Sequence, residues 1–419
     1  MSGTGEQPIK TEVLIAGGGM VGMATAVALA EAGIACVLVD PETPSERLSA
    51  GYDGRSSAIA YGSQQALISL GLWWGMAAAA EPILDIRVSD GRIGAPAGPL
   101  FLHYDHRESG LDAPFGAIVE NRAIRRALLA RLRDLPEVVV VAPGRVGALK
   151  HRAASVEVEL DDGRRVAASL VVAADGARSA LRAAAGIGVA EFAYAQTGIV
   201  CTVTHELPHE GVAHEHFLPS GPFAMLPMTD RDGLHRSSIV WTERRDLAPA
   251  MLALDDDSFS AEIERRFGDS LGRIRLIGRR WSYPLRLLHA ASYVGRRLVL
   301  IGDAAHAIHP IAGQGLNLGI RDVAALAEVL SDAHRLGLDM GASDVLTDYQ
   351  RWRRFDTLLL IAVTDSLNRL FSNDLAPVRL LRDAGLGAVN SIAPVKRLLM
   401  RHAMGAAGPR PRLLRGLPL

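Results

Sequence analysis

Three glycines near the N-terminus have the types and spacing of a phosphate-binding turn. Gly17, Gly19 and Gly22 form a G-x-G-x-x-G pattern, and Asp40 follows 23 positions after the first of them. The first glycine permits a tight turn, the second lets the backbone approach a pyrophosphate, and the third allows close packing of a helix on a strand. A carboxylate at Asp40 can accept hydrogen bonds from an adenosine ribose. The pattern predicts dinucleotide binding; its position at the N-terminus favours FAD, although the spacing fits NAD as well.

The elements that position these residues are read from the apolar pattern around them. Val13–Ala16 and Cys36–Val39 are short apolar runs typical of buried strands, and residues 24–32 form a helical segment closed by Gly33. They predict a strand–helix–strand unit with the helix N-terminus facing the phosphates. The whole stretch 13–39 is apolar enough to be mistaken for a membrane span, but its glycines break it into these pieces.

A second turn places an acid and a glycine after a strand. Asp175-Gly176 follows the apolar run 170–174 and precedes a helix predicted at 179–185. Ligands collect at the carboxyl ends of strands in α/β sheets, so this acid is a candidate binding residue. Taken alone, it is equally well explained as a turn residue that caps the next helix.

A third turn combines an acid with a second glycine-rich segment. Gly302-Asp303 follows the apolar run 297–301, and the glycine-rich turn 313–315 opens a helix whose apolar stripe covers 316–330. This arrangement can place Asp303 against a polyol and the helix N-terminus against an electron-rich ring such as a reduced flavin. A surface turn rich in small residues is the alternative.

In this order the three turns resemble the three signatures of the FAD-dependent aromatic hydroxylases, flavoprotein monooxygenases similar to para-hydroxybenzoate hydroxylase. Two longer stretches, 53–58 and 309–322, resemble the ubiquinone-biosynthesis hydroxylases within that group. Residues 365–373 resemble the 2-polyprenyl-6-methoxyphenol hydroxylase branch. The resemblance implies an α/β fold, with a Rossmann-like FAD-binding domain, an inserted mixed β-sheet substrate domain and a C-terminal helical segment.

The same resemblance implies where the domains divide. The discontinuous FAD-binding domain is expected at 1–75, 115–185 and 291–346. The substrate-binding β-sheet domain is expected at 76–114 and 186–290, with strands at 200–203, 213–218 and 237–241, and the C-terminal helical region at 347–419.

Residue roles carried over from the family begin with the FAD pyrophosphate and ribose. Gly17, Gly19 and Gly22 hold the pyrophosphate, and Asp40 holds the adenosine ribose. Arg55 lies beside the pyrophosphate, with a solvated surface arginine as the alternative. Asn121, just before a helical stripe at 124–132, is a flavin-contacting amide or a helix cap.

The remaining roles concern the nicotinamide and the flavin ring. Asp175 serves both FAD and the passing nicotinamide, and Gly302-Asp303 binds the ribitol chain. Pro310 is expected near the reactive edge of the isoalloxazine. The residues expected along that ring are Gly313, Gln314, Gly315, Leu316 and Asn317.

The activity implied by the resemblance is hydroxylation of a polyprenylated phenol in ubiquinone biosynthesis. NAD(P)H reduces FAD, dioxygen adds at flavin C4a, and the hydroperoxide delivers a hydroxyl group to the ring. The catalytic group that assists the phenol is not identified. His306 and His309 are interpreted as packed or hydrogen-bonding residues, and the histidine spacing indicates no metal site.

Two other functions remain open for this fold. One is a flavin halogenase or an isoprenoid reductase, although the GWxWxIP element of the tryptophan halogenases is absent. The other is a non-catalytic flavoprotein that serves as a member of a ubiquinone-synthesis complex.

The segment 186–290 carries aromatic, methionine and histidine side chains of interest. Candidates to line a site for a prenylated phenol, with an ordinary core as the alternative, are Phe217, Phe223, Met225, Leu226 and Met228. Four histidines are irregularly spaced and are expected to be exposed loop or strand residues: His205, His209, His214 and His216.

Composition and charge limit the partners. The chain has 45 basic and 46 acidic residues, a net charge of −1, which disfavours a nucleic-acid binder. Two cysteines in 419 residues fit a reducing cytoplasm. Basic residues and leucines recur from residue 378 onward. They predict an interfacial segment that binds either anionic lipid on the inner face of the cytoplasmic membrane or a partner complex. A solvated basic helix is the alternative.

Overall fold

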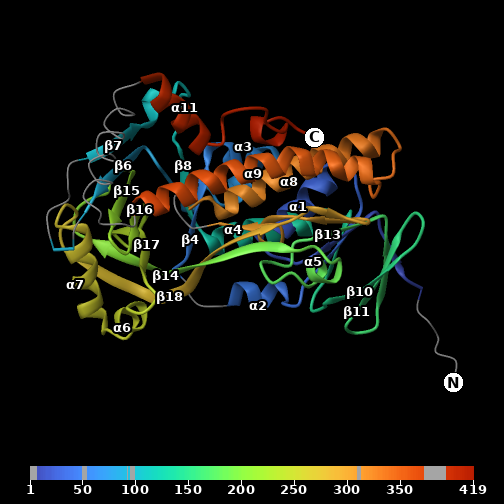
Figure 1. Cartoon of the computed structure of the whole chain (residues 1–419), viewed down its shortest axis with the longest axis horizontal. Coiled ribbons are helices and arrows are strands. Elements are labelled where there is room, and N and C mark those ends of the chain that lie inside the picture. Colours follow the sequence, from blue (N-terminus) through green and yellow to red (C-terminus); the bar gives the residue numbers. More distant parts are fainter. Residues whose placement is uncertain (1–6, 50–53, 92, 95–99, 309–312, 372–392) are drawn as a thin grey trace.

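The strand–helix–strand unit predicted near the N-terminus forms the centre of a six-stranded sheet (Figure 1). The computed structural model of the chain describes residues 7–49, 54–91, 93–94, 100–308, 313–371 and 393–419. Strand β2 (Val13–Ala16) lies between β3 (Cys36–Val39) and β13 (Leu170–Ala173), and all three are parallel. The sheet order is β19-β20-β13-β2-β3-β9. The strands not yet described are β19 (Val294–Gly295), β20 (Leu298–Leu300) and β9 (Val138–Val141).

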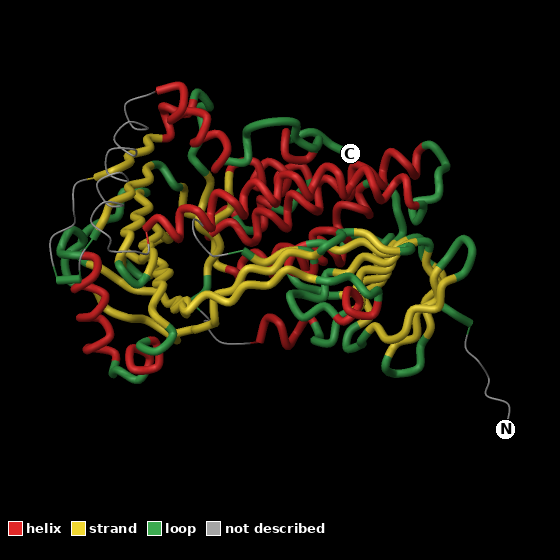
Figure 2. The backbone as a smooth tube through the Cα atoms, viewed as in Figure 1, coloured by secondary structure: helices red, strands yellow, loops and turns green. Residues whose placement is uncertain are grey.

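Helices cover this sheet and bury its apolar strands. Helix α1 (Met20–Glu31) starts earlier than the predicted residue 24 and is buried nearly all round, and Gly33 ends it with φ +76° as expected. Helix α8 (Gln314–Arg335) packs on α1, and α9 (Ser343–Phe371) packs on α8, so that the long helices lie side by side above the sheet (Figure 2). None of the helices in the described part of the chain has both the length and the apolarity needed to cross a membrane.

An eight-stranded mixed sheet occupies the other end of the molecule. Its order is β21-β18-β14-β17-β16-β15-β6-β7. Two of its strands, β14 (Val189–His205) and β18 (Ile274–Ala290), are 17 residues long and run from this sheet towards the first one (Figure 1). The others are β6 (Asp85–Asp90), β7 (Leu100–Asp105), β15 (Val212–Leu218), β16 (Gly221–Arg231), β17 (Leu234–Arg244) and β21 (His306–Ala307).

The two faces of the eight-stranded sheet pack against different partners. Side chains alternate along each strand, so neighbouring residues point to opposite faces. One face packs Phe223, Ile239 and Trp241 against helices α6 (Ala248–Leu252) and α7 (Asp256–Phe267). The opposite face packs against the shorter strands described below and borders Gly313, the residue before α8.

Shorter elements complete the fold. A three-stranded sheet consists of β4 (Ser56–Ala60), β8 (Gly116–Glu120) and β5 (Ala80–Pro82), and a four-stranded sheet of β1 (Ile9–Lys10), β12 (Arg165–Ala168), β11 (Val156–Leu160) and β10 (Val146–His151). The remaining helices are α2 (Pro44–Ser49), α3 (Tyr61–Ser69), α4 (Asn121–Arg133), α5 (Ala180–Ala184) and α11 (Ala393–Ala403). The predicted fold class, an α/β nucleotide-binding unit with a mixed β-sheet insert and a helical C-terminal region, is confirmed.

Candidate active site

The predicted turns meet at one edge of the six-stranded sheet. Ala16, Val39, Ala173 and Leu300 lie abreast at the carboxyl ends of parallel strands. The turns that follow these strands therefore wall a common space, as is usual for ligand sites in α/β sheets. That space consists of two adjoining cavities, and both are lined by Gly19, Ala174 and Gly176.

The glycine turn leaves open space at one of its three glycines. A Cβ on Gly17 would lie 2.3 Å from the carbonyl oxygen of Ala174, and a Cβ on Gly22 would lie 1.9 Å from that of Gly17. Gly19 has an extended backbone (φ −66°, ψ 176°) that any residue adopts, and apart from its chain neighbours no atom of the described residues lies within 4 Å of an added Cβ. The space in front of Gly19, at the N-terminus of α1, fits a pyrophosphate group.

Two predicted acids, Asp40 and Asp175, line one of these two cavities, which we call the first cavity. Asp40 is buried, and its carboxylate accepts hydrogen bonds from the backbone N–H groups of Gly18 and Glu42. Asp175 accepts a hydrogen bond from the N–H of Leu181 at 3.3 Å, yet its Oδ1 is buried and has no hydrogen-bond partner in the described part of the chain. Because a buried polar atom ordinarily has a partner, Asp175 fits a ligand hydroxyl or amide.

The other of the two cavities, which we call the second cavity, is lined by Arg55 and Asn121. Arg55 lies 4.4 Å above the ring of Trp281, so it is not a purely solvated surface arginine. Asn121 is the first residue of α4 and does not cap it; its Oδ1 accepts a hydrogen bond from the hydroxyl of Ser57 at 2.6 Å. Both side chains therefore face the cavity that Gly19 opens into.

The third turn and the start of α8 form the opposite wall of the second cavity. Gly302, Asp303, Gly313, Gly315 and Leu316 line it, as predicted for the flavin side of the site. Gln314 and Asn317 are not among its lining residues. Pro310 and His309 lie outside the described residues.

Asn317 has a structural task behind this wall. Its Oδ1 accepts a hydrogen bond from the N–H of Ala60, and its Nδ2 donates to the carbonyl of Ala58, both at 2.8 Å. Its amide therefore ties α8 to β4 and is engaged with backbone groups. The amide of Asn317 therefore helps to hold that wall, and its expected position along the flavin ring stays a prediction.

A buried ion cluster that the sequence did not reveal supports the Gly302 turn. The carboxylate of Asp322 accepts hydrogen bonds from Nε2 of His306 at 2.7 Å, from the N–H of Gly302 at 2.9 Å and from Nε of Arg353 at 2.7 Å. Burial alone would raise the pKa of Asp322, but His306 and Arg353 hold it below its ordinary value. His306 is thus a packed, hydrogen-bonding residue, as interpreted from the sequence.

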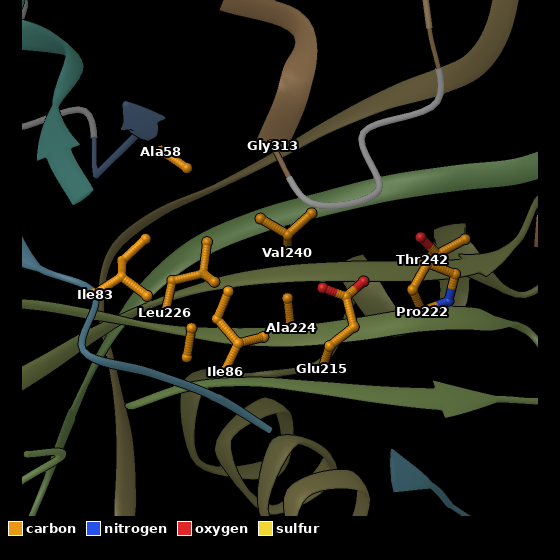
Figure 3. Close-up of a pocket in the computed structure, with 11 residues that line it drawn as sticks. Ala58, Ile83, Ile86, Glu215, Pro222, Ala224, Leu226, Val240, Thr242 and Gly313 are labelled. Carbon is orange, nitrogen blue, oxygen red and sulfur yellow. The ribbon is translucent and has the colours of Figure 1, made fainter. Parts of the chain in front are cut away.

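A smaller, mostly apolar pocket adjoins the second cavity (Figure 3). Ala58, Leu226, Val240 and Gly313 line both spaces, so the two spaces meet there. The volume of this pocket is about 90 Å³, which is smaller than a complete small-molecule site. Its other lining residues are Ile83, Ile86, Ala213, Glu215, Pro222, Ala224 and Thr242.

Of the five candidate lining residues, Leu226 lines this pocket and four do not. Phe223 and Met225 point to the opposite face of β16 and pack in the core beneath α6 and α7. Met228 belongs to a second apolar cluster, and Phe217 is buried without reaching the pocket. Strand alternation turns Phe223 and Met225 away from the pocket, whereas Phe217 and Met228 share its face of the sheet and are buried beyond its lining residues.

The expectation of exposed histidines at 205–216 is wrong. His205, His209 and His216 are buried, and His214 is partly buried. His214 and His216 share one face of β15 and pack edge-on against Phe267 of α7. Burial lowers the pKa of His214 to about 3 and that of His216 to about 4, so both are neutral at pH 7.

Glu215 lies between these histidines and points the other way, into the apolar pocket (Figure 3). Burial raises the pKa of its carboxyl from the ordinary value of 4.5 to about 7. Sequence reasoning missed this residue, although an acid within the apolar run 212–218 was a usable signal.

The stability of the fold is expected to depend on pH through Glu215. Between pH 4.5 and 7 the unfolded chain ionises this carboxyl while the folded chain keeps it protonated, so stability falls as pH rises through this range. At about 1.4 kcal/mol for each pKa unit, Glu215→Gln gains about 3 kcal/mol relative to the native protein above pH 7 and almost nothing at pH 4.5. Urea unfolding at both pH values measures this difference; an equal difference at the two pH values contradicts the expectation.

Comparison with known proteins identifies the fold and family. The sequence pattern of the FAD binding domain family matches residues 10–354. The chain belongs to that family. It is an FAD-dependent monooxygenase, and the predicted cofactors, FAD with NAD(P)H as reductant, are those of the family.

Several relatives of this family member are ubiquinone hydroxylases. It is 54% identical over 419 residues to ubiquinone hydroxylase UbiL of Rhodospirillum rubrum, covering 99% of this chain and 95% of the relative. It is 34% identical over 398 residues to the 3-demethoxyubiquinol 3-hydroxylase of Escherichia coli, covering 94% and 98%. The resemblance to ubiquinone-biosynthesis hydroxylases is confirmed.

A solved structure supports the fold independently. The p-nitrophenol 4-monooxygenase PnpA of Pseudomonas putida DLL-E4 superposes with a TM-score of 0.80, covering 97% of this chain and 100% of that chain at 23% identity. This likeness concerns the fold alone.

Proposed function

We propose that this chain hydroxylates the aromatic ring of a polyprenylated phenol on the route to ubiquinone, using NAD(P)H and dioxygen. The observation that carries the proposal is the junction of two spaces: an apolar pocket with two polar side chains opens beside the cavity that the three FAD signatures wall. Bound FAD, once reduced by NAD(P)H, supplies the activation of dioxygen. The two close relatives described above are named as ubiquinone-pathway hydroxylases.

The proposal assigns FAD to the two adjoining cavities. The open space at Gly19 accommodates the pyrophosphate and Arg55 lies beside it. Asp40 serves the adenosine ribose, and Asp175 serves both FAD and the passing nicotinamide. Asn121, Gly302, Asp303, Gly313, Gly315 and Leu316 face the flavin side. The contacts of Pro310, Gln314 and Asn317 with the ring stay predictions. The apolar junction at Ala58 and Gly313 brings a substrate ring next to the flavin and excludes water from the space between them.

The decisive experiment is an oxygen-labelling assay with the FAD-loaded protein. Incubation with 2-geranylphenol, NADH or NADPH and ¹⁸O₂ is expected to give a product that carries one ¹⁸O on the ring, detected by mass spectrometry. A halogenated product, a saturated prenyl chain, or NAD(P)H oxidation without product would contradict ring hydroxylation and favour the halogenase, the reductase or the non-catalytic function. Deleting the gene tests the pathway, because a ring-hydroxylation precursor of ubiquinone is expected to accumulate.

We also propose the domain division at 1–75, 115–185 and 291–346 for FAD, and 76–114 and 186–290 for the substrate, with the helical region at 347–419. Strands β6, β7 and β14 to β18 of the eight-stranded sheet fall within the proposed substrate segments. The narrower resemblance to 2-polyprenyl-6-methoxyphenol hydroxylase stays a prediction.

Attachment to anionic membranes or to a ubiquinone-synthesis complex is proposed for the C-terminal region. Two of its basic side chains pair within the protein, Lys396 with Glu108 and Arg412 with Glu328. Leu398 and Leu399 of α11 are exposed. Exposed leucines beside basic residues suit the surface of an anionic bilayer. Unchanged binding to anionic vesicles after removal of residues 376–419 would contradict the membrane proposal.

A further inference from the structure

Two polar groups in the apolar pocket have no hydrogen-bond partner among the described residues. Glu215 and Thr242 are the polar side chains among its lining residues (Figure 3). No described residue donates a hydrogen bond to the Glu215 carboxylate, and the Thr242 hydroxyl is buried without a partner in the described part of the chain. Burying such groups unpaired costs free energy, so their presence is not explained by stability.

No described residue around Glu215 offers it a counter-charge. Strands β6, β16 and β17 present Ile86, Ala224 and Val240 to this pocket. Two cations around the same face are engaged elsewhere: Arg236 pairs with Glu120 at 3.0 Å, and Lys396 pairs with Glu108 at 2.6 Å. Arg55 lies in the adjoining cavity, over the ring of Trp281. Within the described part of the chain no group remains to pair with Glu215 and Thr242, so we assign their pairing to a ligand.

The position of Glu215 suits a proton acceptor for a bound ring. Its carboxylate points from β15 towards Val240 and Thr242, on the side where the pocket meets Gly313 and the FAD cavity (Figure 3). A carboxyl with a pKa of about 7 is ionised in part at neutral pH and can both accept and return a proton. A carboxyl at its ordinary pKa would be a much weaker base.

We propose that the Glu215 carboxylate takes the proton from the ring hydroxyl of the phenolic substrate, while the Thr242 hydroxyl donates a hydrogen bond to the ring oxygen. This catalytic role rests on the proposed function. The O–H bond of the phenol breaks, its electron pair stays on the ring oxygen, and the proton forms an O–H bond with a Glu215 oxygen. The resulting phenolate is richer in electrons and is more readily attacked by an electrophilic oxygen donor. The carboxyl returns the proton to the ring oxygen after hydroxylation.

The kinetic test compares holoenzymes with native Glu215, Glu215→Gln and Glu215→Asp on 2-geranylphenol. Glu215→Gln is expected to lower kcat by about 10²- to 10⁴-fold at pH 7.5 with little change in KM. The loss is expected to shrink at high pH and with ring-fluorinated 2-geranylphenol, because these phenols ionise without help, and Glu215→Asp is expected to restore part of the rate. A loss that is the same for all phenols, or a rate within about threefold of the native rate, overturns the role.

Matched controls separate this role from damage to the fold. Glu191→Gln alters an exposed carboxylate on β14 of the same sheet, which pairs with Arg286 at 3.3 Å, and is expected to leave kcat unchanged. The FAD content and melting temperature of each variant are measured alongside the rates. A Glu215→Gln protein that lost FAD would be assessed through the binding experiment below.

A binding experiment without turnover distinguishes this inference from the proposed function. The probe is 2-geranyl-4-nitrophenol, whose yellow phenolate is followed after subtraction of the flavin spectrum. In the native complex the phenol and Glu215 share one proton, so their titrations are coupled and the phenolate colour is expected to rise in two steps as the pH is raised. In Glu215→Gln the phenol titrates alone, and the colour is expected to rise in a single step. One step with the same midpoint in both proteins overturns the inference. Two colour steps in this titration, together with no ¹⁸O incorporation in the labelling assay, would support Glu215 as the partner of the phenol and would refute only the proposed ring hydroxylation.

Discussion

Replacing Gly19 with valine is expected to abolish FAD binding and leave the apoprotein folded. The backbone of Gly19 is extended and does not need glycine, and apart from its chain neighbours an added Cβ would meet no atom of the described residues within 4 Å. The side chain would instead occupy the space that we assign to the pyrophosphate. We expect the affinity for FAD to fall at least about 100-fold, equivalent to about 2.7 kcal/mol. Titration of the apoprotein with FAD, followed by flavin fluorescence, measures the loss.

Two other glycines serve as comparisons for this result. Gly188 also has no such atom within 4 Å of an added Cβ and lies away from the cavities, so Gly188→Val is expected to bind FAD normally. Gly22→Val is expected to unfold the strand–helix–strand unit, because its Cβ would lie 1.9 Å from a backbone oxygen. A Gly19→Val protein that purifies with a full complement of FAD would show that the pyrophosphate lies elsewhere.

The second large effect is expected at Asp322, where Asp322→Asn should cost about 3–5 kcal/mol of the free energy of unfolding. The substitution removes a fully buried charge that pairs with Arg353 and His306, and it leaves Arg353 with Asp356 as its remaining carboxylate partner; loss of one member of a buried ion pair is strongly destabilising. Urea unfolding of the FAD-loaded protein measures the change. The affinity for FAD is also expected to fall, because Asp322 holds the N–H of Gly302 at the cavity wall.

An exposed ion pair on α9 provides the control for Asp322. Asp348 lies 3.7 Å from Arg351 and both side chains are exposed, so Asp348→Asn is expected to change stability by less than about 1 kcal/mol. Equal losses for the two variants would mean that burial of the Asp322 cluster contributes nothing to the fold.

The local parts of this fold could be predicted from the sequence. Strand β2, strand β3 and the turn between β2 and α1 depend on apolar runs and glycines that lie within about thirty residues, and their positions were predicted closely. The carboxyl-edge placement of Asp40, Asp175 and Asp303 follows from parallel strands alone.

The features that were missed depend on contacts between distant segments. Whether Glu215 faces a pocket is decided by the pairing of β15 with β6 and β16, because a slip of one residue would turn it towards α7. The four histidines were expected to be exposed because no local pattern shows that α7 covers His214 and His216. The partner of Asp322 comes from another helix, 31 residues later, which no spacing rule connects.

The order in which the chain is synthesised has a consequence for cofactor loading. Gly19, Arg55, Asn121, Asp303 and Gly315 wall the same cavity although they are spread along most of the sequence. A nascent chain still attached to the ribosome before α8 has emerged therefore lacks one side of the flavin pocket. Cofactor insertion is therefore expected to be completed only after α8 has emerged, late in the biogenesis of this protein.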